Sequence, residues 1–323
     1  MPMIENLLKI SIIFVLLSLV AISSCIKDIT VDLPQAEPCM VVDGYVDFDD
    51  YPIVFLSKST AYFQELDTNA VNETIITDAK ATVIVSDGSI NDTLQYLPIQ
   101  HWPYKCFIGS KFKGQLNHRY DLKILYDGST YTSSTYIPDT IPIDTVFPTF
   151  MNDTFAVMRI NWKDPKNQSN YYTIHVKNQT QAMYYRPYAL NHIISDKMSD
   201  GQAMSFAMVV KGLERNAYYD NFFTKEERDS FVNKLGDVFC FREGDSVSLK
   251  LSTIDNVSYN IWESWYRNYL TDGNPFTNPA SVKTNIDAPD GMRAYGFWVG
   301  YGCNYRSLYL YSKDSVVPIG GKF

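Results

Sequence analysis

The chain has 323 residues and a formal net charge of −8 at pH 7. Its apolar fraction of 46% excludes a disordered chain and suffices for one to three folded domains. The acidic balance, without any run of Lys or Arg, lacks the basic surface that nucleic-acid binding requires. The 24 tyrosines and 18 phenylalanines favour strands over helices, so we expect a mainly β protein.

An uncharged apolar run over residues 10–22 follows Lys9 near the start of the chain. A run of about 13 residues matches the apolar region of a signal peptide. It is shorter than the roughly 20 residues that a membrane-spanning helix needs. The run therefore predicts an exported protein.

The apolar run ends in Ile22-Ser23-Ser24-Cys25, which resembles the bacterial lipobox. Two small residues let the backbone enter a protease cleft, and the cysteine thiol is the nucleophile that accepts a diacylglycerol. We therefore predict a lipoprotein signal peptide over residues 1–24, cleavage between Ser24 and Cys25, and a lipid on Cys25. An ordinary signal peptide followed by a chance cysteine is the alternative.

Residues 25–38 are expected to form a tether, because they end in a segment with two prolines. Residues 39–140 then predict an N-terminal β-sandwich. Its first strands are expected over residues 39–48 and 51–59, where apolar residues lie between turn signals.

Two Asp-Gly pairs, Asp87-Gly88 and Asp127-Gly128, interrupt alternating apolar runs later in this segment. Asp-Gly between such runs is a strong signal for a tight β-hairpin turn. We therefore expect a hairpin around each pair.

Three prolines within residues 137–148 predict an extended connector and a domain boundary. Beyond it, residues 149–323 predict a C-terminal β-rich domain. A strand ending in Trp162, a polar turn at residues 163–165 and a Tyr-rich alternating strand resemble the early strands of a fibronectin type III or immunoglobulin-like sandwich. The expected architecture is two such β-sandwich domains.

Two helical insertions are expected in the C-terminal domain. Over residues 224–236, Thr224 and Glu227 have capping-box spacing and Gly236 ends the pattern. Over residues 256–271, between strands expected at 246–254 and 295–302, five apolar residues share one helical face. They are Tyr259, Trp262, Tyr266, Tyr269 and Leu270, of which Trp262, Tyr266 and Tyr269 are expected to be core.

Three aromatic residues are candidates for binding a ligand or a protein partner. Trp265 lies off the apolar face of the second helix, and Trp298 and Tyr301 lie in the late strand. Exposed Trp and Tyr side chains provide stacking platforms for sugars and anchors for protein interfaces.

Four further cysteines, Cys39, Cys106, Cys240 and Cys303, are candidates for disulfides in an exported protein. Three full pairings exist, and Cys39–Cys106 with Cys240–Cys303 would respect the predicted domain boundary. Free buried thiols are the alternative, because both domains are large enough to fold without disulfides.

Two threonines in the proline-rich connector, Thr140 and Thr145, are candidate O-glycosylation sites. Each lies in an Asp-Thr-aliphatic triplet that resembles the signal used on exported Bacteroidetes proteins. The connector makes these triplets the most accessible of the five in the chain.

No catalytic constellation emerges from the sequence. No zinc-ligand spacing occurs among the four histidines, which are His101, His118, His175 and His192. Gly244-Asp245-Ser246 resembles the nucleophile block of GDS-type lipases, but those enzymes need a downstream histidine. None follows His192, so this reading is rejected.

The acidic segment 43–50 offers carboxylates for sugar hydrolysis or for calcium, but it lacks the EF-hand pattern. A solvated turn is expected there. We therefore predict a chain without catalytic residues, bound metal or cofactor.

Several segments in order resemble a Bacteroidetes family of outer-membrane lipoproteins known as domain of unknown function 4249. They are CIKDITVDLPQAEPCMVVDGYV, DAKATVIVSDG, YTSSTYIPDTIPIDTV, NWKDPKNQSNYYTIHV and TNIDAPDGMRAYGFWVGY. The likeness covers essentially the whole mature chain. Genes of this family often lie beside a TonB-dependent outer-membrane receptor. The resemblance implies an accessory lipoprotein and supplies no catalytic residues.

The expected function is that of a non-enzymatic lipoprotein, anchored at the outer membrane, that partners a TonB-dependent receptor in substrate capture or uptake. A free-standing surface lipoprotein that binds carbohydrate or peptide is the alternative. A hydrolase with a carboxylate pair assembled by the fold is the third and least favoured reading. The sequence leaves open whether the protein lies on the surface or the periplasmic face.

Overall fold

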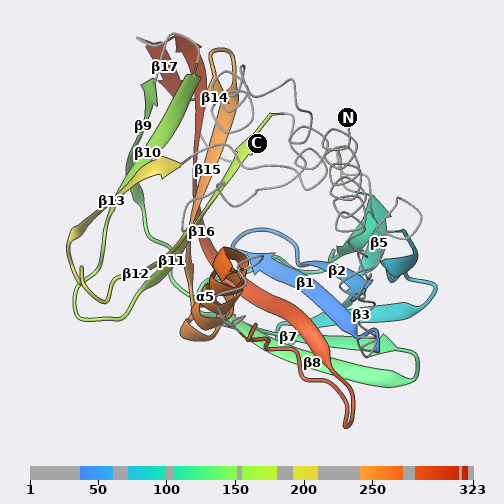
Figure 1. Cartoon of the computed structure of the whole chain (residues 1–323). Helices are drawn as coiled ribbons and strands as arrows, with labels where there is room; N and C mark the ends of the chain where they lie inside the picture. The colour runs from blue at the N-terminus through green and yellow to red at the C-terminus, as the bar shows by residue number, and fades with distance from the viewer. Residues whose placement is uncertain are drawn as a thin grey trace, which may run out of the picture. The chain divides into compact units, whose positions relative to one another are not determined.

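The computed structural model in Figure 1 describes residues 37–60, 72–98, 105–150, 155–179, 192–209, 241–271, 281–312 and 315–318. The chain divides into two compact units, Met1–Glu37 and Pro38–Phe323, and every element below belongs to the second. The predicted signal peptide with Ser24 and Cys25, the predicted helix over 224–236 and Cys240 lie outside the described residues.

Strands dominate the described part of the chain, as its aromatic and β-branched composition predicts. The first eight are β1 (Met40–Asp47), β2 (Ile53–Lys58), β3 (Ala81–Ser86), β4 (Asn91–Thr93), β5 (Gln95–Pro98), β6 (Lys105–Ile108), β7 (His118–Tyr126) and β8 (Ser129–Ile137). The next seven are β9 (Ile143–Phe150), β10 (Phe155–Lys163), β11 (Tyr171–Asn178), β12 (Ile193–Ser195), β13 (Ala203–Val209), β14 (Phe241–Arg242) and β15 (Ser246–Ile254). The last elements are helix α5 (Asn256–Thr271), β16 (Ala294–Ser312) and β17 (Ser315–Pro318).

These strands form one large sheet and two smaller ones. The nine-stranded sheet has the order β12-β11-β15-β16-β1-β2-β6-β5, and β17 also pairs with β16. One four-stranded sheet has the order β4-β3-β7-β8. The other has the order β13-β10-β14, and β9 also pairs with β10.

Strand β16 lies in the middle of the large sheet and joins its two halves. Its first part, Ala294 to Tyr301, pairs in parallel with β1, and its next part, Gly302 to Tyr309, pairs antiparallel with β15. Figure 1 shows this long strand passing from the side of β1 to the side of β15. One strand of 19 residues therefore belongs to both halves of the molecule.

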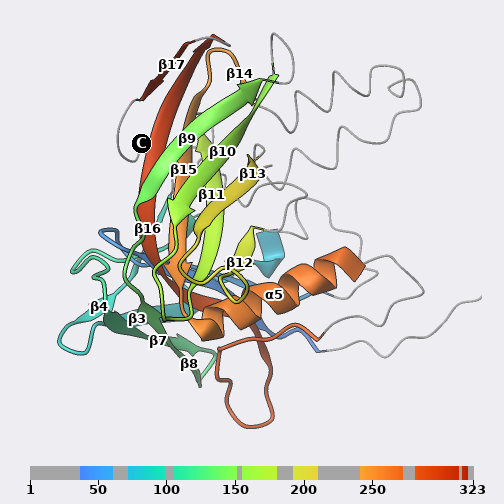
Figure 2. The same cartoon turned by 90° about the vertical axis from the view of Figure 1, so that its left-hand side faces the viewer.

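Each half of the large sheet packs against one of the smaller sheets. In the first core, Val42 of β1 packs with Val83 of β3 and Ile124 of β7. In the second core, Leu249 of β15 packs with Ile160 of β10. Figure 2 shows β9 and β10 as a layer in front of β15 and β16. The structure is therefore mainly β with two sandwich-like packings, as predicted, and both use the same large sheet.

The predicted boundary between two domains, placed at residues 140–149, does not match this arrangement, because residues from both sides of it share the first core. Ile286, Ala294 and Trp298, assigned to the C-terminal domain, lie in the first core. The predicted connector also contains a strand, because β9 starts at Ile143 and pairs with β10. Since β9 pairs with β10 alone among the described strands, its one proline, Pro148, interrupts no second ladder of hydrogen bonds.

Both Asp-Gly hairpins are confirmed. Asp127 and Gly128, with φ of 49° and 73°, join the paired residues Tyr126 and Ser129 at the ends of β7 and β8. Positive φ at both central residues is the signature of a type I′ turn, whose twist matches that of the flanking strands. Gly88, with φ of 88°, lies in the turn between β3 and β4.

Helix α5 begins after Asp255, whose Oδ1 accepts a hydrogen bond of 2.7 Å from the backbone N–H of Ser258. This bond satisfies an N–H of the first turn that has no partner within the helix. The bounds Asn256–Thr271 match the predicted helix. Within the described ranges, no helix is long and apolar enough to cross a membrane.

The predicted core face of α5 is only partly correct. The buried residues are Ser258, Ile261 and Ser264, whereas Tyr269 and Leu270 are 41% and 60% exposed. Two small serines on the contact line let the helix backbone approach the protein body closely. The bulky aromatic side chains therefore flank this line instead of lying on it.

Candidate functional site

Two of the three predicted binding aromatics are buried. Trp298 has no exposed surface and donates its indole N–H to the carbonyl of Tyr120 at 3.0 Å. Tyr301 is 4% exposed. Both predictions of a surface role are wrong, because β16 lies inside the large sheet with side chains covering both of its faces. The near-continuous apolar run of this strand was the signal for double-sided burial.

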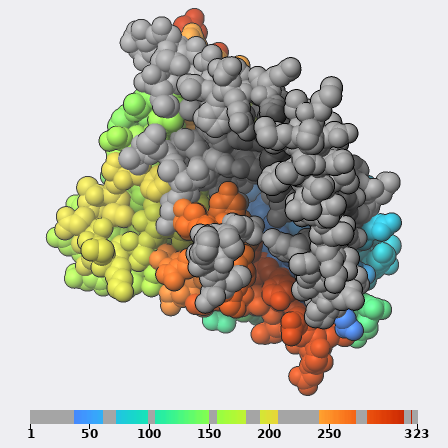
Figure 3. All heavy atoms as spheres, viewed as in Figure 1, coloured from blue at the N-terminus to red at the C-terminus, as the bar shows by residue number. Residues whose placement is uncertain are grey.

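Trp265 is half-buried and belongs to a short row of aromatic rings on α5. Its ring lies parallel to that of Tyr269, with centres 6.2 Å apart and planes 5° apart, and edge-on to Trp262 at 6.0 Å. Figure 3 shows atoms of α5, in orange, at the surface of the viewed face. Trp265 with Tyr269 stays a candidate surface platform.

The candidate disulfide between Cys39 and Cys106 is not formed, because both residues carry free thiols, which was the alternative reading. Cys39 precedes β1, and its Sγ lies 3.2 Å from Ser59 Oγ. Cys106 belongs to β6, and β2 separates β6 from β1 in the sheet. Two strand spacings are about 10 Å, and a disulfide needs Cα atoms within roughly 7 Å. Cys303 is also free and buried.

The two candidate glycosylation sites differ in exposure. Thr145 is exposed on β9, and its Oγ1 accepts a hydrogen bond of 2.8 Å from the Asn161 side chain. Thr140 is half-buried, 3.5 Å from the Asn304 side-chain nitrogen. Access therefore favours Thr145, and modification of either residue stays a prediction.

The most strongly built polar site in the described part of the chain is a buried ion pair. Lys250 Nζ lies 2.7 Å from Oδ1 and 2.6 Å from Oδ2 of Asp47, and both side chains are only 5% exposed. The Tyr305 hydroxyl donates a third hydrogen bond, of 3.1 Å, to Asp47 Oδ2. Burying two charges costs several kcal/mol for each ion, which only such close contacts offset.

Three strands position this pair. Asp47 ends β1 opposite Tyr301 of β16, and Lys250 lies in β15 opposite Tyr305 of β16. The pair therefore connects the two strands that flank the central one. We call Asp47, Lys250, Tyr45, Tyr301 and Tyr305 the Asp47–Lys250 centre.

Aromatic rings enclose the ammonium group. Lys250 Nζ lies 4.4 Å from the ring centre of Tyr301 and 5.7 Å from that of Tyr45, within the range of cation–π attraction. Burial raises the pKa of both tyrosines well above the usual value, and the charge of Asp47 adds to this effect. Both hydroxyls therefore stay neutral at physiological pH.

The centre continues into a polar and aromatic layer beneath α5. Trp262 donates its indole N–H to the Tyr301 hydroxyl at 3.0 Å, and His175 lies edge-on to the Tyr301 ring at 5.7 Å. The Cys303 thiol donates to the Tyr301 carbonyl at 3.3 Å. Burial raises the pKa of this thiol to about 12, so it is not a reactive thiolate at neutral pH.

Sequence reasoning missed this centre. Asp47 was assigned with its neighbours to a solvated turn, which is correct for Asp49, with a side chain 75% exposed, and wrong for Asp47. Lys250 was part of a correctly predicted strand, SVSLKLSTI, whose residues are almost all buried. A lysine flanked by leucines in such a strand was the available signal, because a buried ammonium requires a partner.

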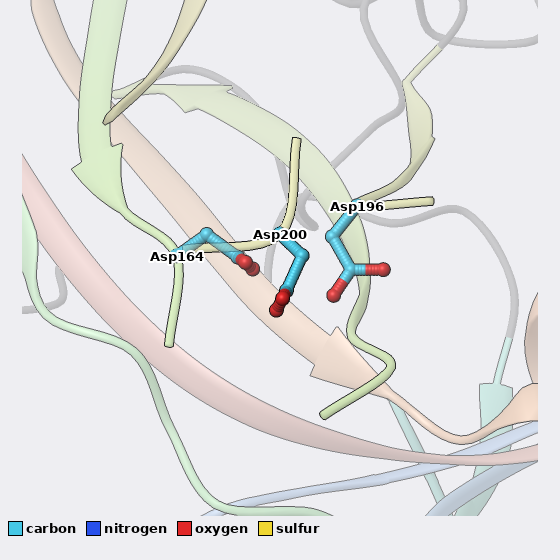
Figure 4. Close-up of side chains that lie close together, drawn as sticks. All are labelled: Asp164, Asp196 and Asp200. Atoms are coloured by element: carbon cyan, nitrogen blue, oxygen red, sulfur yellow. The ribbon is translucent and has the colours of Figure 1, made fainter. Parts of the chain in front are cut away.

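A second cluster contains three carboxylates from two neighbouring loops, shown in Figure 4. Candidate ligand oxygens of Asp164, Asp196 and Asp200 all lie within 4.8 Å of one another. Such oxygens suit a hard cation. Asp164 Oδ2 already accepts the Gly201 N–H at 2.7 Å, and Oδ1 accepts the Tyr172 hydroxyl.

Further hydrogen bonds hold the other two carboxylates. Asp196 Oδ2 accepts the Asn170 N–H at 2.7 Å, and Asp200 Oδ1 accepts the Asn167 N–H at 2.9 Å. These bonds fix the β10–β11 turn against the loop after β12. The cluster is therefore explained as a support for two loops.

Comparisons with known proteins identify a family and no named relative. The family model described as "Domain of unknown function (DUF4249)" matches residues 26–303. No curated protein matches the chain. Among solved structures, the chain is similar to a two-domain fibronectin type III segment from chicken tenascin, at 7% identity and a TM-score of 0.19. That match covers 67% of this chain and 90% of the tenascin segment.

The family match spans the tether, all of the strands from β1 to β15, helix α5 and the part of β16 that pairs with β1. It therefore includes the first sandwich core, the second core apart from Leu308 and Leu310, and the Asp47–Lys250 centre apart from Tyr305. The chain belongs to the DUF4249 family.

Proposed function

We propose that this protein is an outer-membrane lipoprotein, anchored through Cys25, that acts without catalysis as an accessory partner of a TonB-dependent receptor. The observation that carries the proposal is the sequence Ile22-Ser23-Ser24-Cys25 directly after an apolar run of signal-peptide length. Membership of the DUF4249 family supports it, because the family resemblance connects such lipoproteins with receptor genes.

The anchor would hold the protein by burial of acyl chains. Each buried methylene contributes ~0.8 kcal/mol, so one chain binds a membrane marginally and two or more bind it firmly. A diacylglycerol on Cys25 would therefore suffice for retention. The segment from Cys25 to Met40, where β1 begins, would then act as the tether between lipid and fold.

The chemistry of the described residues favours a binding role over catalysis. The buried carboxylates of Asp47 and Asp164 each bond to several groups of the fold. The buried thiols of Cys106 and Cys303 have their pKa raised to about 12 by burial. Groups held in this way support structure and do not present an activated nucleophile.

The alternative, a free-standing surface protein that binds carbohydrate or peptide, has one observation in its favour. Trp265 and Tyr269 present parallel rings on α5, and Tyr269 is 41% exposed. Flat aromatic faces of this kind stack against sugar rings and anchor protein contacts.

Affinity purification from native membranes tests the two roles. The full-length protein, tagged at its C-terminus, is extracted in mild detergent, and the bound proteins are identified by mass spectrometry. The proposal predicts that a TonB-dependent receptor is recovered in near-stoichiometric amount. Recovery of the lipoprotein alone, together with retention on a polysaccharide or peptide matrix that Trp265→Ala abolishes, would support the alternative.

A further inference from the structure

We propose that Asp47 and Lys250 condense into an intramolecular amide that covalently joins β1 to β15. The two residues are 203 positions apart in the sequence, and their charged groups meet at 2.6 and 2.7 Å inside the protein. The inference rests on this centre alone and is independent of the proposed membrane anchor.

The geometry is that of a reactive pair held in place. The amine contacts both carboxylate oxygens, so the two groups that would react already lie in direct contact. Both groups project from paired strands of one sheet, so neither has to be ordered before reaction. Because the fold already holds the two groups together, the reaction carries no further entropy cost for bringing them into contact.

Burial disfavours both charges of the ion pair, whereas the rings of Tyr301 and Tyr45 and the Tyr305 hydroxyl stabilise them. Both side chains are 5% exposed, and the rings of Tyr301 and Tyr45 cover the amine. The amide forms from the neutral pair, which differs from the ion pair by transfer of one proton from Nζ to the carboxylate. The products of this transfer are a free amine and a carboxylic acid.

The reaction balances without an oxidant or other co-reactant. The lone pair of Nζ attacks Cγ, the Nζ–Cγ bond forms, and the Cγ–Oδ2 bond breaks. Oδ2 leaves as water with two protons, both of which originate on the lysine nitrogen. The Tyr305 hydroxyl donates a hydrogen bond to Oδ2 at 3.1 Å, so it stabilises the negative charge that develops on this oxygen as its bond to Cγ breaks.

The product relieves the cost of the buried charges. An ion pair at this position has two desolvated ions, whereas an amide has none and retains a carbonyl acceptor near the Tyr305 hydroxyl. The same enclosure that promotes condensation limits the return of water for hydrolysis. The amide would join the end of β1 to β15 across the strand β16 that lies between them.

Two other ion pairs in the described residues lack these features and serve as references. Lys113 Nζ and Asp49 Oδ1 lie 3.2 Å apart with side chains 46% and 75% exposed. Arg267 and Glu263 pair along α5 at the surface. A hydrated ammonium stays protonated, and a guanidinium is not a nucleophile, so no amide is expected at either pair.

Mass spectrometry of the denatured full-length protein tests the proposal. The amide predicts an intact mass lower by one water molecule, loss of tryptic cleavage after Lys250, and a branched peptide that joins the segments containing Asp47 and Lys250. Cleavage after Lys250 together with linear peptides that contain Asp47 would overturn it. Loss of water with cleavage at Lys250 intact would indicate cyclisation elsewhere and would also count against the proposal.

Matched variants isolate the reacting groups. Lys250→Arg keeps a positive charge beside Asp47 but removes the nucleophile, so the loss of water should disappear. Lys113→Arg changes the exposed pair and should leave both the loss of water and the branched peptide unchanged. The wild-type peptide map decides the question even where Lys250→Arg accumulates poorly.

Discussion

Trp298 donates its indole N–H to the carbonyl oxygen of Tyr120 at 3.0 Å, although 178 residues separate them in the sequence. Trp298 lies in β16, near the end of the chain, and Tyr120 lies in β7 of the first sandwich. The residue of β1 that faces Trp298 is Gly44, and its lack of a side chain leaves room for the indole ring. A Cβ atom at Gly44 would lie 2.9 Å from the indole. The first sandwich is therefore completed by the last long strand.

A fragment with residues 38–140 should not fold cooperatively. Without β16, β1 loses its parallel partner and the first core loses Trp298. The backbone groups of β1 that face β16 would also lack their hydrogen bonds. Urea titration followed by tryptophan fluorescence and circular dichroism should give a broad transition for the fragment and a sharp one for residues 38–323. A sharp transition of the fragment would establish an independent N-terminal domain.

Trp298→Ala should lower the free energy of unfolding by about 3–5 kcal/mol, the usual cost of removing a fully buried large aromatic side chain. The side chain has no exposed surface and its N–H is bonded, so both packing and a hydrogen bond are lost. Trp265→Ala is the control, because Trp265 is half-buried on α5 and its removal should cost much less. Equal losses for the two variants would contradict the assignment of Trp298 to the core.

Asp47→Ala should lower the free energy of unfolding by about 3–5 kcal/mol or more, because it leaves the Lys250 ammonium buried without its carboxylate. Loss of the proposed amide would add to this effect. Asp49→Ala, which removes the carboxylate of an exposed ion pair two residues later, should have little effect. Denaturant titration of both variants at neutral pH and moderate salt makes the comparison. A stable Asp47→Ala protein would show that the centre does not hold the fold.

Stability should fall as the pH rises from about 9 to about 12, because the thiols of Cys106 and Cys303 have pKa values raised to about 12 by burial. In the unfolded chain these thiols ionise near their ordinary pKa, so over this range the unfolded state binds fewer protons than the folded state. The buried tyrosines act in the same direction. Replacing both cysteines with alanine should reduce the slope of stability against pH, measured by urea titration at several pH values. An unchanged slope would show that these thiols are not buried in their neutral form.

The sequence predicted elements that depend on local signals. The Asp-Gly hairpins, the strand at 246–254 and the helix at 256–271 follow from turn chemistry, alternation and helical period. The mainly β class follows from composition. In each case the residues that carry the signal lie within the element or beside it.

Long-range pairing was not predictable in the same way. Nothing in the sequence of β16 shows that its first part pairs with β1 and its next part with β15, because the partners lie far along the chain. The domain boundary and the roles of Trp298 and Tyr301 were therefore misjudged. The partner of Lys250 was hidden for the same reason, although a lysine within a buried strand indicated that a partner was needed.

The proposed anchoring at the outer membrane depends on a lipid at Cys25. The most direct test compares the wild-type protein with Cys25→Ser by membrane fractionation and intact mass measurement in the native cell. The wild-type protein should carry acyl mass on an N-terminal Cys25 and sediment with the outer membrane. The Cys25→Ser protein should lack this mass and lose membrane retention. A wild-type protein without acyl mass at Cys25, or an unacylated variant that still sediments fully with the outer membrane, would contradict the proposed anchoring.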